Sequence, residues 1–177
     1  VVNTAAIPPG AKVAVLGLGG VGLNALMAAT LSGADRVIAV DVLDDKLAFA
    51  RQLGATDTVN AGDADCVEQI KELTKGGVDY AIELAGVPKA LDIAYKMCRR
   101  GGTVVTAGLP RPEATLDIPI AQMVSDNRTI KGSYMGSCVP SRDSNRFLSL
   151  YTQCKLPVHQ LRDGFVVFHG LNTSLNR

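Results

Sequence analysis

The sequence of 177 residues has few of the residue types that build metal sites, disulfide frameworks and catalytic histidine clusters. It contains no tryptophan and four cysteines, which are Cys66, Cys98, Cys138 and Cys154. No two of them form a C-x-x-C pair, so their spacing indicates neither a zinc site nor a disulfide framework. Such cysteines are typical of a reduced protein, and we expect a cytoplasmic location. The two histidines, His159 and His169, are isolated, so we assign neither of them a catalytic role.

An excess of charge of one sign is also absent. The 18 Lys and Arg residues nearly balance the 17 Asp and Glu residues, and the formal net charge is +1. This balance lacks the basic signature of a protein that binds nucleic acid or an anionic membrane. We therefore expect neither nucleic acid nor a membrane as a partner.

One long uncharged segment, residues 13–34, could be mistaken for a membrane span. It contains five glycines and Asn24, and its first part has the character of a strand and its second part that of a helix. A parallel strand that is buried on both faces explains the same apolar content. No signal-peptide pattern begins the sequence.

The glycines in this segment follow the spacing G-x-G-x-x-G, formed by Gly17, Gly19 and Gly22. Gly17 is expected to make a tight turn out of a buried strand, and Gly19 to let the backbone approach a phosphate closely. Gly22 would let the following helix pack tightly. The start of this helix, near Val21, would direct its free N–H groups at a diphosphate.

The flanking residues supply the context that this motif needs. The segment Pro8-Pro9-Gly10, which interrupts regular secondary structure, precedes the first apolar run. A second apolar run at residues 37–40 ends in Asp41. Asp41 lies 19 residues after Gly22, close to the spacing expected of an acid that binds an adenosine ribose. Its carboxylate would repel the 2′-phosphate of NADP, and residues 42–46 contain no arginine to bind one. The sequence favours NAD, with NADP as the alternative that Lys46 could tolerate.

The rest of the chain alternates apolar runs with helical patterns, which is typical of a parallel sheet with crossover helices. We predict an α/β fold with a doubly wound, six-stranded parallel sheet of the Rossmann type. The expected strands begin near residue 13 and then cover residues 37–40, 58–60, 78–84, 103–107 and 129–135. The expected helices cover residues 21–31, 44–53, 66–73, 88–98, 118–126 and 141–153. In the last of these helices, Phe147, Leu148 and Tyr151 are expected to face inward.

Ligands of such sheets bind beyond the carboxyl ends of the strands, where the winding reverses. Asp41, Gly86, Gly108 and the pair Met135–Gly136 are all expected at this edge. The segment from Ala107 to Pro112 is predicted to be a loop whose backbone donors and acceptors suit the carboxamide of a nicotinamide.

Several blocks of the sequence resemble the coenzyme-binding domain of the zinc-type medium-chain alcohol dehydrogenase family. Residues 7–22 resemble the family's opening strand and phosphate loop, and residues 41–46 and 53–56 its second-strand block. Residues 77–80 are similar to its entry into the fourth strand, and residues 129–133 to its sixth strand. The resemblance covers most of the chain.

The resemblance implies a set of cofactor-binding residues. Asp41 would hold the adenosine ribose and Lys46 would support it. Val21 would pack on the nicotinamide ring, whose carboxamide would be oriented by backbone groups of Ala107, Leu109, Ser133 and Met135. The pyrophosphate loop consists of Gly17, Leu18, Gly19, Gly20, Val21 and Gly22, and Gly108 completes the cofactor-binding set.

In the family, the zinc ligands and proton-relay groups belong to a second domain, placed mostly before this segment and completed after it. We therefore expect residues 1–177 to be a single dinucleotide-binding domain excised from a two-domain enzyme, with no catalytic or metal-binding residue of its own. Residues 1–10 would lead in, and residues 155–177 would begin the return to the catalytic domain. The family also predicts a homodimer that pairs through the strand at residues 129–135.

The parent protein is then expected to transfer hydride between NAD and a small alcohol, aldehyde or ketone. Three alternatives stay open. A zinc-free quinone oxidoreductase would use NADPH, and Asp41 argues against it. A methyltransferase would hold S-adenosylmethionine with a similar glycine loop and acid, although the full glycine motif is less typical of it. A non-enzymatic sensor would use NAD only as a ligand.

Overall fold

The computed structural model of the protein describes residues 1–163. The strands are β1 (Lys12–Leu16), β2 (Arg36–Asp41), β3 (Asp57–Asn60), β4 (Val78–Glu83), β5 (Cys98–Thr106) and β6 (Thr129–Gly132). The helices are α1 (Gly20–Leu31), α2 (Asp44–Gln52), α3 (Cys66–Thr74), α4 (Pro88–Met97), α5 (Ile120–Asp126), α6 (Pro140–Thr152) and α7 (Gln160–Asp163), with one 3-10 turn, η1 (Met135–Ser137). His169 and most of the predicted return segment at residues 155–177 lie outside the described residues.

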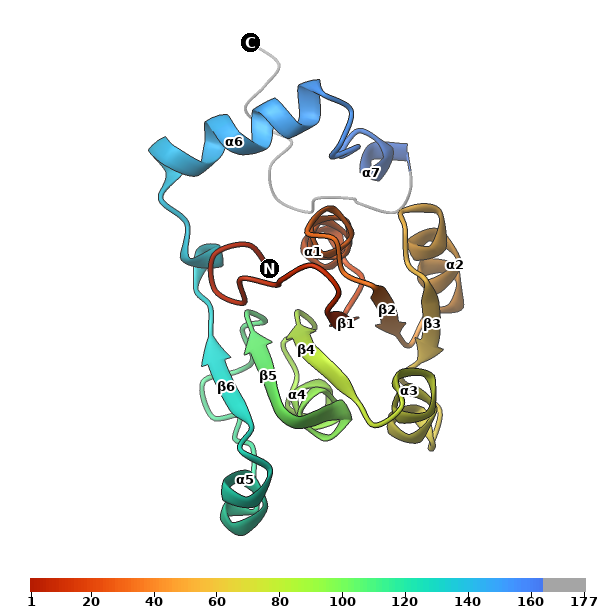
Figure 1. The fold of residues 1–177 in the computed structure, drawn as a ribbon, viewed down its shortest axis with the longest axis vertical. Coiled ribbons are helices and arrows are strands. Elements are labelled where there is room, and N and C mark those ends of the chain that lie inside the picture. The colour runs from red at the N-terminus through yellow and green to blue at the C-terminus, as the bar shows by residue number, and fades with distance from the viewer. Residues whose placement is uncertain (164–177) are drawn as a thin grey trace.

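The six strands form one parallel sheet in the order β3-β2-β1-β4-β5-β6 (Figure 1). The chain moves outward from β1 to β3, returns to the middle at β4 and then moves outward in the other direction. The winding therefore reverses between β1 and β4, which lie side by side. The prediction of a doubly wound Rossmann sheet is confirmed.

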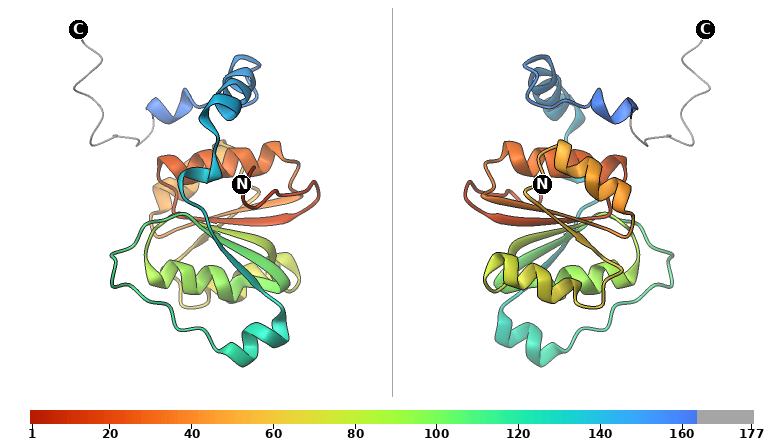
Figure 2. Two further views of the ribbon diagram at one scale, coloured as in Figure 1. Left: turned by 90° about the vertical axis from the view of Figure 1, so that its left-hand side faces the viewer. Right: turned by 90° about the vertical axis from the view of Figure 1, so that its right-hand side faces the viewer.

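Helices cover both faces of the sheet, with α1 and α2 on one side and α3 and α4 on the other (Figure 2). Side chains alternate between the faces along each strand, so Val13 and Val15 of β1 contact the first helix layer while Ala14 and Leu16 contact the second. Both sets are buried. Burial on two faces explains why the central strands are apolar without interruption.

The uncharged segment at residues 13–34 is accounted for by β1 and α1, and α1 has 12 residues. Among residues 1–163, none of the helices has the length and apolar character that crossing a bilayer requires.

The four cysteines are free thiols. Burial raises the pKa of Cys66 to about 11, and burial likewise raises the pKa of Cys98 to about 12. Both thiols belong to the core between the sheet and the second helix layer, and they stay protonated near neutral pH. Cys138 and Cys154 are exposed.

The last predicted strand is shorter than expected. β6 ends at Gly132, and Met135 belongs to η1 instead. Met135, Gly136 and Ser137 have φ values of 47°, 67° and 50°, a left-handed backbone that no strand can continue. The predicted strand of residues 129–135 was therefore wrong beyond Gly132.

The predicted inward face of α6 was also partly wrong. Leu148 and Tyr151 are 60% and 42% exposed. Phe147 packs against the core on the side of the first helix layer, as predicted. Leu150, three residues later on the same helix face, packs against this core as well. Tyr151 instead meets His159 edge to face at the surface, with 6.3 Å between the ring centres.

Candidate nucleotide-binding site

The turn after β1 is shaped by the absence of side chains. Gly17 has a φ of +85°, and a Cβ atom added there would lie 2.7 Å from the backbone nitrogen of Ala85 in the neighbouring β4 turn. A Cβ atom at Gly22 would lie 1.8 Å from the carbonyl oxygen of Gly17. The first turn of α1 therefore packs directly on the glycine turn, as the sequence predicted.

Gly19 is different, because a Cβ atom added there would meet no atom of residues 1–163 within 4 Å. It is exposed and stands immediately before α1, which begins at Gly20. The first N–H groups of a helix have no partner within the helix, and no side chain in the described part of the chain caps this end of α1. With no acid in the first turn, the positive end of α1 is open to an anion beside the glycine turn.

Asp41 is the last residue of β2, and its side chain turns toward the glycine turn rather than into solvent. It is 7% exposed. Its Oδ2 accepts a hydrogen bond of 2.7 Å from the N–H of Leu18, and its Oδ1 accepts one of 3.2 Å from the N–H of Leu43. An ionised carboxylate has about four acceptor positions, so further hydroxyl groups can still donate to it.

Lys46, in the first turns of α2, lies beside this acid. Its Nζ is 3.8 Å from Oδ2 of Asp41, and its side chain is 29% exposed. The structure thus brings together Leu18, Asp41 and Lys46 at one end of the predicted cofactor site. The N–H of Leu18 is occupied by the acid, which leaves the groups from Gly19 onward to face a phosphate.

The nicotinamide end of the predicted site also converges. The N–H of Ala107 donates to the carbonyl of Glu83 at 3.0 Å, and the N–H of Ser133 donates to the carbonyl of Thr106 at 2.9 Å. The segments after β4, β5 and β6 therefore continue side by side. Val21, Ala107, Ser133 and Met135 line one cleft of about 780 Å³.

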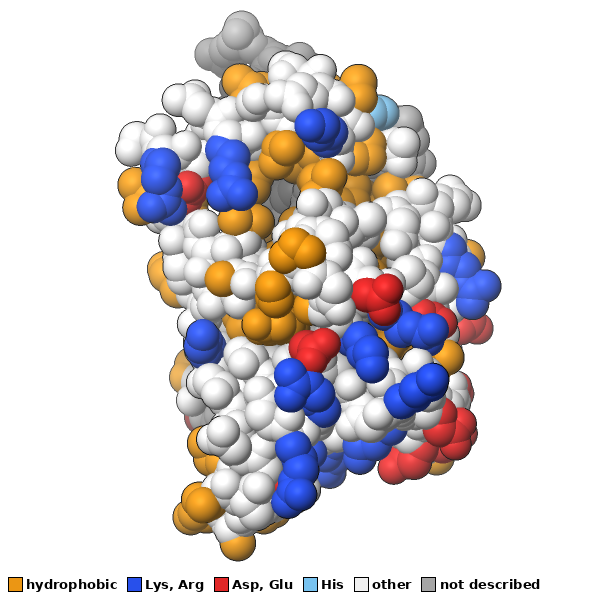
Figure 3. Space-filling view, in the orientation of Figure 1, with side chains coloured by type: hydrophobic (Ala, Val, Ile, Leu, Met, Phe, Trp, Pro, Cys, Tyr) orange, Lys and Arg blue, Asp and Glu red, His pale blue; other side chains and the backbone are white. Residues whose placement is uncertain are grey.

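This cleft is largely apolar, and α6 forms part of its wall. Figure 3 shows hydrophobic side chains gathered around the hollow between α6 and the body of the sheet. Val21 and Met135 are 68% and 78% exposed, so apolar surface is available to a flat ring. Leu109, which is 80% exposed, and Gly108 lie instead against the Gly86 turn.

Several residues that support this edge were not predicted from the sequence. Glu83 is a buried carboxylate at the end of β4, and an acid at the end of an apolar run was the signal available for it. Asn3 and Thr4 bind the segment after β6: the Thr4 hydroxyl lies 2.8 Å from that of Ser133 and 2.9 Å from that of Ser137. Asn3 donates to the Gly136 and Ser137 carbonyls. These contacts span more than 125 positions, so no local pattern reveals them.

The sheet order, together with the glycine turn at its centre, defines a doubly wound α/β domain of the dinucleotide-binding class. A sequence model of a family described as zinc-binding dehydrogenase matches residues 20–153. The chain belongs to this family.

Three relatives illustrate the similarity. Alcohol dehydrogenase 1 of Oryza sativa subsp. indica is 34% identical over 99% of this chain and 47% of its own length. The crystal structure of benzyl alcohol dehydrogenase from Acinetobacter calcoaceticus is 35% identical, with a TM-score of 0.88 over 90% of this chain and 44% of that one. A protein from Sinorhizobium meliloti 1021, solved bound to NADP, is 34% identical, with a TM-score of 0.72 over 75% of this chain and 40% of that one. The chain spans about half the length of these relatives.

The glycine turn makes a testable contrast between two alanine substitutions. Gly22→Ala places a methyl group against the Gly17 carbonyl and should lower the free energy of unfolding by about 1–3 kcal/mol or more. Gly19→Ala, which meets open space in an extended backbone, should change it by about 0.5 kcal/mol or less. Thermal or urea unfolding of both variants measures this. Equal destabilisation would contradict the packing described.

Proposed function

We propose that this chain is the NAD-binding domain of an alcohol dehydrogenase-like oxidoreductase. The observation that carries the proposal is the Asp41 carboxylate, which is held beside the glycine turn by the N–H of Leu18. An acid in this position can accept hydrogen bonds from both hydroxyls of an adenosine ribose. Membership of the zinc-binding dehydrogenase family supports the oxidoreductase class.

The residues present fit such a cofactor. The open space next to Gly19 and the N-terminus of α1 suit a diphosphate. The cleft lined by Val21 suits a planar ring. When bound, the nicotinamide supplies the hydride acceptor or donor. Backbone groups of Ala107, Leu109, Ser133 and Met135 would orient its carboxamide, while Val21 covers one side of the ring and excludes water there.

The proposal extends to the parent protein, in which an alcohol and a carbonyl compound would be interconverted. In the family's organisation, the zinc and the proton-relay groups belong to a second domain. We therefore propose that this domain by itself, in the cytoplasm or in solution, binds the cofactor without turnover.

NADP is the second candidate cofactor, because the relative from Sinorhizobium meliloti was solved with NADP bound. In this chain, a 2′-phosphate would approach the buried Asp41 carboxylate, and the repulsion between the two negative charges disfavours it. Lys46 lies close enough to offset part of that repulsion. We therefore propose a preference for NAD rather than an absolute exclusion of NADP.

Calorimetric titration with NADH, NADPH and S-adenosylmethionine tests the proposal, since the protein has no tryptophan to report binding. NADH should bind most tightly. Asp41→Ala should weaken NADH binding by about tenfold or more, because it removes a charged acceptor of ribose hydroxyls. It should also reduce the ratio of the affinity for NADH to the affinity for NADPH. A wild-type preference for NADPH would favour the quinone oxidoreductase alternative. Binding of S-adenosylmethionine alone would refute the dehydrogenase assignment.

We also propose a homodimer that pairs through β6. This strand is at the edge of the sheet, and Thr129, Lys131 and Gly132 in it are exposed. An unpaired edge strand is a template for another strand, and the neighbouring α5 exposes Ile120 and Val124. Sedimentation equilibrium at micromolar concentration should give twice the chain mass of 18.6 kDa. A monomer over the same range would contradict the proposal.

A further inference from the structure

Glu83 is a carboxylate buried in the centre of the sheet. It ends β4, the strand beside the winding reversal, and is 1% exposed. Among the described residues, none of the ion pairs includes it. Burying a carboxylate without a cation is costly unless strong hydrogen-bond donors compensate. The burial of the Glu83 carboxylate therefore requires specific hydrogen-bond donors.

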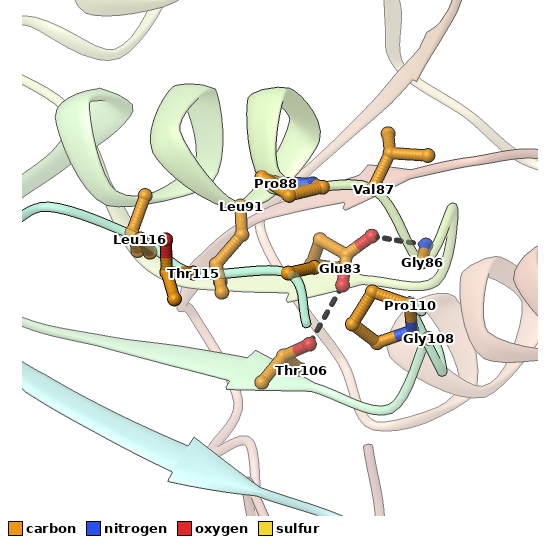
Figure 4. Close-up of a pocket in the computed structure, with 11 residues that line it drawn as sticks. Glu83, Gly86, Val87, Pro88, Leu91, Thr106, Gly108, Pro110, Thr115 and Leu116 are labelled. Carbon is orange, nitrogen blue, oxygen red and sulfur yellow. Dashed lines mark hydrogen bonds between the residues drawn. The ribbon is translucent and has the colours of Figure 1, made fainter. Parts of the chain in front are cut away.

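Two donors meet this carboxylate from different segments (Figure 4). Its Oε1 accepts a hydrogen bond of 2.7 Å from the backbone N–H of Gly86, in the turn between β4 and α4. Its Oε2 accepts one of 2.7 Å from the Thr106 hydroxyl at the end of β5. The side chain thus connects the β4 turn with the end of the next strand.

The two segments that it connects are in backbone contact. A Cβ atom at Gly108 would lie 2.2 Å from the Gly86 nitrogen, and one at Gly86 would lie 3.1 Å from the Leu109 nitrogen. Gly86 itself has a φ of +70°. There is no space for side chains between the two turns, so their relative position depends on the groups that bridge the two segments. These groups are the Glu83 carbonyl, which accepts from the Ala107 N–H, and the Glu83 carboxylate. The carboxylate is among the residues around a small cavity of about 60 Å³.

We propose that Glu83 is a positioning residue for cofactor binding. Its carboxylate fixes the Gly86 turn and the end of β5 together, so that the peptide groups of Ala107 and Leu109 are oriented before the nicotinamide carboxamide arrives. This inference rests on the proposed function. It assigns to a side chain that does not touch the cofactor the preorganisation of the loop that does.

The test separates the nicotinamide end of the cofactor from the adenosine end. Glu83→Gln keeps the shape but removes the charge and one acceptor, and Thr106→Val removes one donor. Each variant should weaken NADH binding by about fivefold to tenfold, the effect of one or two misoriented hydrogen bonds. Binding of ADP-ribose, which lacks the nicotinamide, should change by about twofold or less. Calorimetric titration of both ligands measures the two effects.

Thr152→Val is the matched control, because the Thr152 hydroxyl is exposed and, among residues 1–163, bonds only the Ser149 carbonyl in its own helix. It should leave both affinities unchanged. Thermal unfolding establishes whether each variant is folded. If Glu83→Gln does not fold, Thr106→Val still tests the positioning role.

The outcomes distinguish this inference from the function on which it rests. Equal losses of NADH and ADP-ribose affinity, or no loss of either, in variants of a wild type that binds NADH would overturn the positioning role and leave the proposed function intact. A wild-type protein that binds neither ligand would overturn the proposed function and this inference together.

Discussion

The packing of α1 on the turn after β1 is the constraint on which the rest of the site depends. The Gly17 carbonyl lies where a Cβ atom of residue 22 would be, and the Gly17 backbone lies against Ala85 of the neighbouring turn. Three backbone segments therefore meet without side chains between them. Because of this approach, the start of α1 faces the central crevice of the sheet, and the Leu18 N–H is within reach of Asp41.

The same principle operates on the other side of the winding reversal. There the turns after β4 and β5 are in contact through Gly86 and Gly108. The buried Glu83 carboxylate accepts hydrogen bonds from the Gly86 N–H and from the Thr106 hydroxyl at the end of β5. The segment after β6 has a left-handed backbone at Met135, Gly136 and Ser137. At the two residues that are not glycine, this conformation costs about 1–3 kcal/mol each. Hydrogen bonds with the side chains of Asn3 and Thr4 stabilise this turn. The edge is thus built from conformations that distant contacts stabilise.

The sequence predicted the sheet well because its information there is local. Apolar runs, glycine turns and helix patterns repeat in the order that a doubly wound sheet requires, and the spacing of Asp41 from Gly22 follows from one strand-helix-strand unit. The inward face of α6 was not predictable in the same way. Phe147, Leu148 and Tyr151 are all apolar or aromatic, and only packing against the core on the first helix layer's side of the sheet distinguishes Phe147 and Leu150 from Leu148 and Tyr151. Glu83 was missed because its donors, Gly86 and Thr106, come together only in the folded sheet.

We propose that a dinucleotide binds across the carboxyl edge of this sheet, and a two-dimensional NMR titration with NADH would show this directly. The chain mass of 18.6 kDa, which doubles in the proposed homodimer, is within the range in which amide signals can be assigned. We expect shifts at the amides of Gly19, Val21, Leu43, Leu109 and Met135, which follow four different strands. Shifts confined to the opposite edge, around Gly10, Arg99 and Gly101, or a spectrum that NADH leaves unchanged would contradict it.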